Sequence, residues 1–369
     1  MYIHELTDWP HFHWNNEVVA KLLAEVRHKQ GLLLGRMEAL GFNFRQEAVL
    51  RTLTTDVLKS SEIEGETLDA EQVRSSIARR LGMDIGALKA ADRDVEGVVE
   101  MMLDATRHYD QPLMADRLFG WHAALFSTGH SGIRKIKVAA WRGDSDGPMQ
   151  VVSGPIGREH VHFEAPASLR VEKEMNGFLD WFNSDAGIDL VMKAGLAHLW
   201  FVTIHPFDDG HGRIARAIAD MTLARSENNS QRFYSMSAQI RKERGDYYKV
   251  LEQTQKAGMD VTLWMEWFLA CLGRAIEGAQ TALGIVLEKA KFWERVQNTT
   301  INERQRLVLN KVLDGFEGKL TTAKYAKLTK SSHDTALRDI AQLIEKGLLE
   351  RSSEGGRSTS YTLADFSGE

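Results

Sequence analysis

Apolar residues recur three and four positions apart along most of this chain, and only six prolines interrupt its 369 residues. Clear stretches of this spacing cover residues 22–37, 95–103, 171–182 and 191–204. Such spacing places apolar side chains on one face of a helix, and proline breaks helices, so the pattern predicts a mainly α protein. A single core rarely exceeds roughly 250–300 residues, so we expect more than one folding unit.

Between residues 133 and 166 the helical pattern is lost. Glycines cluster there, and the run at residues 149–152 favours a strand, so the segment predicts a β-hairpin or an extended flap. An exposed strand edge can recruit the backbone of a partner peptide as an added strand. A plain surface hairpin is the alternative interpretation.

The last seventy residues have a different character. Residues 303–313, 322–328 and 332–346 have the length of helices, and β-prone runs at 348–351 and 360–363 flank a turn rich in Ser and Gly. This order is typical of a winged helix-turn-helix. Residues 302–369 carry eleven Lys or Arg and ten Asp or Glu, a difference of only +1, which is weak support for DNA binding. Docking of a protein target or dimerisation are the alternatives.

Composition excludes several classes of protein. A net charge of −5 excludes a globally basic protein that coats nucleic acid. One cysteine, Cys271, forms neither an internal disulfide nor a thiolate metal site, which favours a cytoplasmic location. The first residues lack the apolar core of a signal peptide, and the most apolar stretch, 261–272, is shorter than the about 20 residues of a membrane span. We therefore expect no membrane contact.

The segment His205–Arg216, HPFDDGHGRIAR, carries the strongest chemical signal. Gly210 and Gly212 precede a helix expected to begin near Arg213, and backbone N–H groups at such a start bind anions. Arg213 and Arg216 lie three positions apart on one helix face, and guanidinium groups suit phosphate oxygens.

Acidic and basic side chains complete this segment. Asp208 and Asp209 offer the hard oxygen ligands that Mg²⁺ prefers, and His205 titrates near neutral pH and can accept a proton. A base, a metal carboxylate, an anion site and two arginines within twelve residues indicate phosphoryl or nucleotidyl transfer. A transition-metal site made of the His and Asp residues, or a plain turn between helices, are the alternatives.

The segment resembles the signature of the Fic family, HPFx(D/N)GNGRxxR. The matching residues are His205, Pro206, Phe207, Asp209, Gly210, Gly212, Arg213 and Arg216. Proteins of this family transfer AMP from ATP to a hydroxyl side chain of a target protein. The resemblance implies a Fic-type helical core with a β-hairpin flap, His205 as the base and Asp209 as the Mg²⁺ ligand.

The same resemblance implies roles for the rest of the segment. Gly210 to Gly212 would cradle the phosphates, Arg213 and Arg216 would hold the outer phosphates, and Phe207 would anchor the loop in the core. His211 stands where the family usually has Asn. It can still donate an N–H to the α-phosphate, but it is bulkier, so the transfer rate and the choice of nucleotide stay open.

Three further groups of residues match or flank family elements. In the flap these are Val151, Val152, Ser153 and Gly154, and in the adenine pocket Tyr248 and Gln255; core packing is the alternative for the latter two. His160 and His162 alternate beside the flap as metal ligands can. No carboxylate pattern supports a metal there, so we expect them to be structural.

An upstream segment resembles the inhibitory motif of the family, (S/T)xxxE(G/N). Ser60 and Glu64 are spaced to share one face of a helix end, with Gly65 following. A solvated helix end capped by Gly65 is the alternative. The resemblance implies that Glu64 pairs with Arg216 and fills the space of the γ-phosphate, as in the subgroup whose inhibitory helix precedes the core.

These observations lead to one hypothesis and two rivals. The chain is expected to hold an N-terminal helical region with the inhibitory motif, a catalytic core, a helical linker and a winged unit, at residues 1–110, 111–275, 276–300 and 301–369. We expect a self-inhibited adenylyltransferase that uses ATP and Mg²⁺ to modify a Ser, Thr or Tyr hydroxyl of a protein target or of itself. The rivals are a de-AMPylating hydrolase that uses Glu64, and a DNA-binding regulator with a nucleotide-sensing core. A homo-oligomer is compatible with the sequence.

Overall fold

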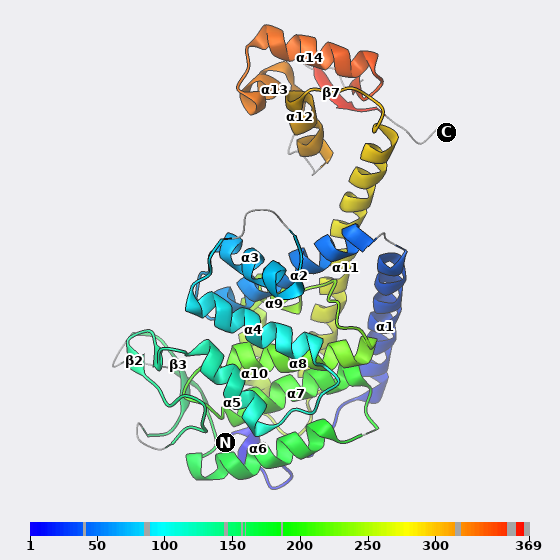
Figure 1. Cartoon of the computed structure of the whole chain (residues 1–369). Coiled ribbons are helices and arrows are strands. Elements are labelled where there is room, and N and C mark those ends of the chain that lie inside the picture. Colours follow the sequence, from blue (N-terminus) through cyan, green and yellow to red (C-terminus); the bar gives the residue numbers. More distant parts are fainter. Residues whose placement is uncertain are drawn as a thin grey trace. The chain divides into compact units, whose positions relative to one another are not determined.

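The computed structural model describes the chain except residues 40–41, 85–88, 144–146, 156–157, 159, 186, 314–318, 353–358 and 365–369. Side chains are also not described at 42–43, 285–288 and 290–291. The chain divides into two compact units, residues 1–279 and 280–369 (Figure 1). The expectation of more than one folding unit is thereby met, and each unit is described by itself.

Unit 1 is mainly helical, as the apolar spacing predicts. After a short 3-10 helix η1 (Ile3–Glu5), its helices are α1 (Asn16–Glu38), α2 (Phe42–Ile63), α3 (Ala70–Leu81), α4 (Arg93–Arg107), α5 (Ala115–Leu125), α6 (Ser168–Asn183), α7 (Leu190–Ile204), α8 (His211–Glu227), α9 (Met236–Lys242), α10 (Arg244–Gln255) and α11 (Thr262–Arg295). From residue 280 onward, α11 belongs to unit 2. Helix α1 begins six residues before the predicted stretch because the Asn15 side chain caps it, accepting hydrogen bonds from the N–H groups of Glu17 and Val18.

The core of unit 1 is centred on two helices. Helices α7 and α8 pack side by side (Figure 1), and every residue of α7 after Leu190 is buried. A helix that is apolar all round is stable only when other elements cover it on every side. Helices α2, α4 and α5 pack against α8, and α6 packs against α7. The loop between α7 and α8 is therefore held at the end of the most deeply buried pair of helices.

Two small hairpins accompany the helices of unit 1. Strand β1 (His130–Ser131) pairs with β2 (Arg134–Lys135), and β3 (Gln150–Ser153) pairs with β4 (His160–Glu164), both antiparallel. A register shift interrupts the second pair between Val151 and Val152. The prediction of a hairpin between residues 133 and 166 is confirmed.

After the end of α11, the described residues of unit 2 form three further helices and a small antiparallel sheet. The helices are α12 (Glu303–Leu313), α13 (Thr322–Thr329) and α14 (His333–Glu345), and the strand order is β5 (Leu320–Thr321), β7 (Ser360–Leu363), β6 (Leu349–Arg351). This is the predicted order of elements with β5 added, a strand of two residues that is too short to show a pattern. The Ser- and Gly-rich turn lies largely outside the described residues.

Helix α14 is the third helix predicted for the last seventy residues, and it begins at a capped end. Ser332 is its N-cap, and the hydroxyl accepts a hydrogen bond from Thr335 N at 3.2 Å. The core of unit 2 is formed by Val308, Leu309, Tyr325, Ile340 and Leu343, among others. Among the described helices of both units, none is long and apolar enough to cross a membrane.

Candidate functional site

His205 ends helix α7 in a left-handed backbone conformation, with φ 51° and ψ 59°. A residue other than glycine in this region carries a strain of about 1 kcal/mol, so its surroundings must hold it. Its N–H donates to Phe201 O at 3.1 Å, and its ring Nδ1 donates to Val202 O at 2.5 Å. A carbonyl only accepts, so the proton lies on Nδ1 and the Nε2 atom of the neutral ring offers a lone pair.

The protein environment keeps His205 neutral. Burial lowers the pKa of His205 to about 4, and the Arg142 guanidinium acts in the same direction. Arg142 also holds the loop: its Nε donates to His205 O at 2.6 Å and its backbone N–H to Pro206 O at 2.9 Å. Arg142 lies 63 residues upstream, outside any recognisable motif, so no sequence signal identified it.

Phe207 fixes the middle of the loop in the core. Its side chain is fully buried and stacks on His122 with ring centroids 4.3 Å apart, with Trp141 at 5.1 Å. Aromatic rings packed in this way contribute more than their buried area alone. Phe207 therefore anchors the loop between His205, two residues before it, and Asp208, the next residue.

Helix α8 begins at His211, two residues before the predicted start at Arg213. Gly210 is its N-cap with φ 84°, a conformation that favours glycine, and a Cβ there would lie 2.8 Å from Phe126 Cε2. The N–H groups of His211, Gly212 and Arg213 belong to the first turn, where intrahelical acceptors are lacking. This helix start suits an anion.

A carboxylate from the inhibitory segment lies at this helix start. Glu64 Oε1 is 2.8 Å from Arg216, whose side chain is only 2% exposed. Arg216 also donates from Nε to Ser60 Oγ at 2.9 Å and from a terminal nitrogen to Ser60 O at 2.8 Å. A Cβ at Gly212 would lie 2.0 Å from Glu64 Oε1, so the glycine is what admits the carboxylate.

A second carboxylate contacts the other arginine. Arg213 donates to Glu66 Oε2 at 2.5 Å, and its guanidinium lies 5.1 Å from the centre of the Phe126 ring. The turn after α2 aims both acids at α8: Gly65 has φ +86°, and Glu66 N donates to Ser61 O at 3.0 Å. This is the hydrogen-bond pattern of a glycine C-cap. The Glu66 contact was not predicted.

His211 is turned into the loop. Its ring is buried and stacks on His205 with centroids 3.8 Å apart, and its Nε2 lies 2.7 Å from Phe207 O. Burial, and then the neighbouring His205, lower the pKa of His211 well below its ordinary value. Phe207 N also lies 3.2 Å from Nε2, but the shorter contact is to a carbonyl, which only accepts, so the proton lies on Nε2 and a lone pair on Nδ1. The ring N–H thus donates within the loop, and the predicted donation from His211 to an α-phosphate stays a prediction.

A cavity of about 650 Å³ collects most of the predicted site residues. Its lining includes Glu64, Val151, Val152, Ser153, His205, Asp209, Gly210, His211, Gly212, Tyr248 and Gln255. Tyr248 is 36% exposed with the Arg244 guanidinium 5.1 Å from its ring centre, whereas Gln255 is buried and donates to Thr203 Oγ1 at 3.2 Å. The predicted residues outside this lining are Ser60, Gly65, Gly154, Arg213 and Arg216.

A second cavity, of about 260 Å³, reaches the same histidine. His205, Asp209 and His211 line both cavities, and Ser131 and Asp208 line the smaller one. His205 is therefore accessible from two separate spaces. This arrangement would allow the base to meet one substrate while another is held on its other side.

The acidic residues of the loop offer oxygen ligands. Asp209 accepts hydrogen bonds from the Ser131 hydroxyl and from Gly210 N, the latter at 2.6 Å. Asp208 Oδ2 accepts from Lys137 N at 2.7 Å. Both carboxylates face the smaller cavity, and hard oxygen donors of this kind fit Mg²⁺.

The flap presents one strand edge. Strand β3 pairs with β4 on one side, and within the described residues no strand pairs with its other edge. Val152 is 48% exposed there, and Gly154, with φ +104°, follows the strand. An edge of this kind is open to pairing with an extended peptide.

Comparisons with known proteins agree with this geometry. Residues 112–223 match the Fic/DOC family, and residues 2–83 match a domain of unknown function. The protein adenylyltransferase Fic of Nematostella vectensis is 33% identical over 114 residues, which cover 30% of this chain and 25% of that protein. A probable protein adenylyltransferase of Aquifex aeolicus is 33% identical over 61 residues, 16% of this chain and 19% of that protein. A Fic family protein from Desulfovibrio desulfuricans shares the fold, with a TM-score of 0.53 at 21% identity over 97% of this chain and 98% of that one.

Proposed function

The chain contains a Fic/DOC family domain at residues 112–223, and from this premise we propose that it is a self-inhibited protein adenylyltransferase. It would transfer AMP from ATP to a hydroxyl side chain of a protein target or of itself. The observation that carries this proposal is the position of His205, a neutral imidazole on the wall shared by two cavities. The relatives named adenylyltransferase support the reaction class.

The proposed reaction is a displacement at the α-phosphorus of ATP. The hydroxyl oxygen of the target forms a bond to that phosphorus, the α–β phosphoanhydride bond breaks, and pyrophosphate leaves. His205 Nε2 takes the proton of the hydroxyl, since Nδ1 is engaged with Val202 O. The first turn of α8 stabilises the negative charge on the phosphates. Asp209, with Asp208 beside it, would hold Mg²⁺, which supplies charge neutralisation for the leaving pyrophosphate.

We propose that the two cavities separate the two substrates. The larger one would take the nucleotide, with Tyr248 beside the base and the start of α8 at the phosphates. Its volume is in the usual range for small-molecule sites, about 300–1,000 Å³. The smaller one would admit the target side chain, whose backbone pairs with the free edge of β3.

Self-inhibition follows from Glu64. Its carboxylate occupies the start of α8 and pairs with Arg216, so an anionic phosphate group would meet both a filled space and a like charge. The placement of this segment before the core supports the subgroup with an N-terminal inhibitory helix. Arg216 becomes available to the nucleotide only after Glu64 moves away.

Incubation with labelled ATP and Mg²⁺ tests the proposal. We expect Glu64→Gly to raise self-labelling by about tenfold or more, a change of about 1.4 kcal/mol in transition-state stabilisation. His205→Ala in the same background should abolish labelling. Glu62→Gly is the matched control, since Glu62 lies at the same helix end and pairs with Lys59 rather than with α8. Equal labelling by the His205 and Glu64 variants would contradict the proposal.

The same variant distinguishes the transfer from a hydrolysis that removes AMP. If Glu64 positions water to remove AMP from a modified protein, Glu64→Gly loses that activity instead of gaining one. Release of labelled AMP from a pre-modified target by wild-type protein, and its loss in Glu64→Gly, would favour the hydrolase.

A further inference from the structure

Two histidines of the flap lie on one face of a strand. His160 and His162 are two positions apart in β4, so their side chains point the same way. Their ring centroids are 4.6 Å apart and the rings are nearly perpendicular, at 85°. The sequence provided this alternation but no carboxylate beside it.

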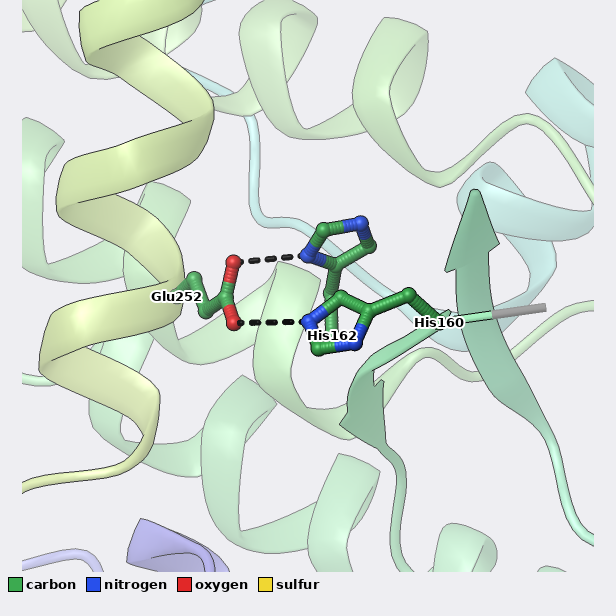
Figure 2. Close-up of side chains that lie close together, drawn as sticks. All are labelled: His160, His162 and Glu252. Atoms are coloured by element: carbon green, nitrogen blue, oxygen red, sulfur yellow. Dashed lines mark hydrogen bonds and ion pairs between the residues drawn. The ribbon is translucent and has the colours of Figure 1, made fainter. Parts of the chain in front are cut away.

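Helix α10 supplies the missing carboxylate. Glu252 lies opposite both imidazoles (Figure 2), with Oε2 2.7 Å from His162 Nδ1 and Oε1 3.9 Å from His160 Nε2. One ligand atom from each of the three residues lies within 4.8 Å of the others. Ligands of a tetrahedral zinc ion lie roughly 3.3 Å apart, given bonds of about 2.0–2.2 Å. Small side-chain rotations therefore bring these atoms into ligand positions, and His160, 68% exposed, is free to make them.

From this geometry we propose that His160, His162 and Glu252 bind a divalent metal ion such as zinc. Two imidazoles and one carboxylate favour zinc, cobalt or nickel over Mg²⁺ and Ca²⁺, which prefer oxygen. Three protein ligands of this type are those of zinc sites that keep one position open. The site is separate from the oxygen ligands of Asp208 and Asp209.

Neighbouring side chains orient the ligands. Ser153 Oγ lies 2.6 Å from His162 Nε2, so the hydroxyl oxygen can accept a hydrogen bond from Nε2–H when Nδ1 binds the ion. Such a partner on the second ring nitrogen is typical of metal-bound histidine. Lys256 donates to Glu252 Oε1 at 2.5 Å, and this contact, with His162, holds the pKa of Glu252 below its usual range. Oε2 of the carboxylate is turned to His162, and Oε1 lies between His160 and Lys256.

The ion would connect the flap to the nucleotide cavity. His162 and Glu252 line that cavity, together with Ser153 of β3. A metal bond from β4 to α10 would hold the hairpin in place at the rim of the cavity, where the hydrogen bond between His162 and Glu252 now joins the two elements. The inference does not depend on the transfer reaction, because it concerns binding only.

Calorimetric titration of the full chain with ZnCl₂ tests the site. The protein is first treated with a chelator to remove bound metal. Millimolar MgCl₂ in the titration buffer then occupies oxygen ligands elsewhere in the chain. We expect one zinc ion per chain in the micromolar range, and a weakening of about tenfold or more in Glu252→Gln and in His162→Ala. His108→Ala is the matched control, since His108 pairs with Asp104 at 2.8 Å as a single imidazole, and it should bind zinc as wild type does.

Thermal unfolding gives a second readout. Equimolar ZnCl₂ should raise the unfolding temperature of wild-type protein and of His108→Ala but not of Glu252→Gln, which preserves the shape of the side chain. Unchanged zinc affinity in Glu252→Gln would overturn the proposal. So would zinc binding that survives there and is lost in Asp209→Ala, because the ion would then lie in the loop after α7. ATP-dependent labelling is measured separately, so either proposal can fail alone.

Discussion

Replacing Glu64 should lower the stability of the free protein and raise its affinity for ATP. We choose Glu64→Ala for this measurement, because alanine avoids the added backbone freedom of glycine. Arg216 is 2% exposed and Glu64 29% exposed, and they are joined at 2.8 Å. The variant leaves the guanidinium with the two acceptors of Ser60. The two effects of the replacement have opposite signs, so one variant tests both.

The size of the destabilisation follows from this contact. A hydrogen bond to a charged group contributes about 1.5–3 kcal/mol, and water entering the partly exposed space of Glu64 recovers part of it. We therefore expect a loss of about 1–2 kcal/mol in the free energy of unfolding. For a unit of this size the unfolding temperature should fall by about 2–8 °C.

With MgATP bound, the unfolding temperature of Glu64→Ala should lie above that of wild type, the opposite of the order without nucleotide. A ligand at a hundred times its dissociation constant stabilises by about 2.7 kcal/mol, more than the contact that was lost. The assay is thermal unfolding followed by circular dichroism, with and without millimolar MgATP. The variant should start lower and shift further upward than wild type, whose Arg216 is already paired.

Glu62→Ala is the control for this experiment. Glu62 is 29% exposed, as Glu64 is, and it pairs with Lys59 at 2.7 Å. It should show a small loss of stability and the nucleotide response of wild type. If Glu64→Ala unfolds as wild type does, or shows no larger shift with MgATP, the carboxylate does not compete with the phosphates and the reasoning fails.

Three further predictions address the neighbouring contacts. Glu66→Ala frees the buried Arg213 and should lower the free energy of unfolding by only about 0.5–1 kcal/mol, since Glu66 is 46% exposed. Calorimetry should detect tighter ATP binding by this variant. Weaker binding would argue against Glu66 as a second carboxylate that competes with the phosphates. Phe207→Ala empties a fully buried site and should cost about 3–5 kcal/mol in urea unfolding, and a loss under about 1 kcal/mol would refute its anchoring role. Burial lowers the pKa of His205 to about 4, and the base must be neutral to accept a proton. The rate of AMP transfer by Glu64→Gly should therefore stay level from pH 8 to about pH 5 and fall only toward pH 4. A fall in rate centred near pH 6.5 would contradict this.

Elements with strong local signals could be predicted from the sequence. Helix α12 and strand β7 have the predicted bounds, Glu303–Leu313 and Ser360–Leu363, because apolar spacing and turn residues act over a few positions. Helices α3 and α9 were not predicted. Ser75 and Ser76 occupy buried positions of α3, which weakens its apolar pattern, and α9 has seven residues, less than the window that reveals a helical period.

The candidate site likewise has parts that the sequence predicts and parts that it does not. The loop from His205 to Arg216 is contiguous, so its residue types alone indicated an anion site with a base beside it. The tautomer of His205, the inward turn of His211 and the contact of Glu66 depend on backbone carbonyls and charges from other segments. No local pattern carries that information.

What the sequence determined by itself was a mainly helical chain, with one loop whose residue types predict an anion site and an upstream segment that resembles an inhibitory motif. Only the tertiary structure placed Arg142 against the backbone of that loop and Glu252 against two histidines of the flap. Glu252 lies 90 residues from His162 in the chain. Side chains so far apart meet through packing of the helices and hairpins of unit 1, in which α7 and α8 form the buried centre, and packing of that kind has no local sequence pattern.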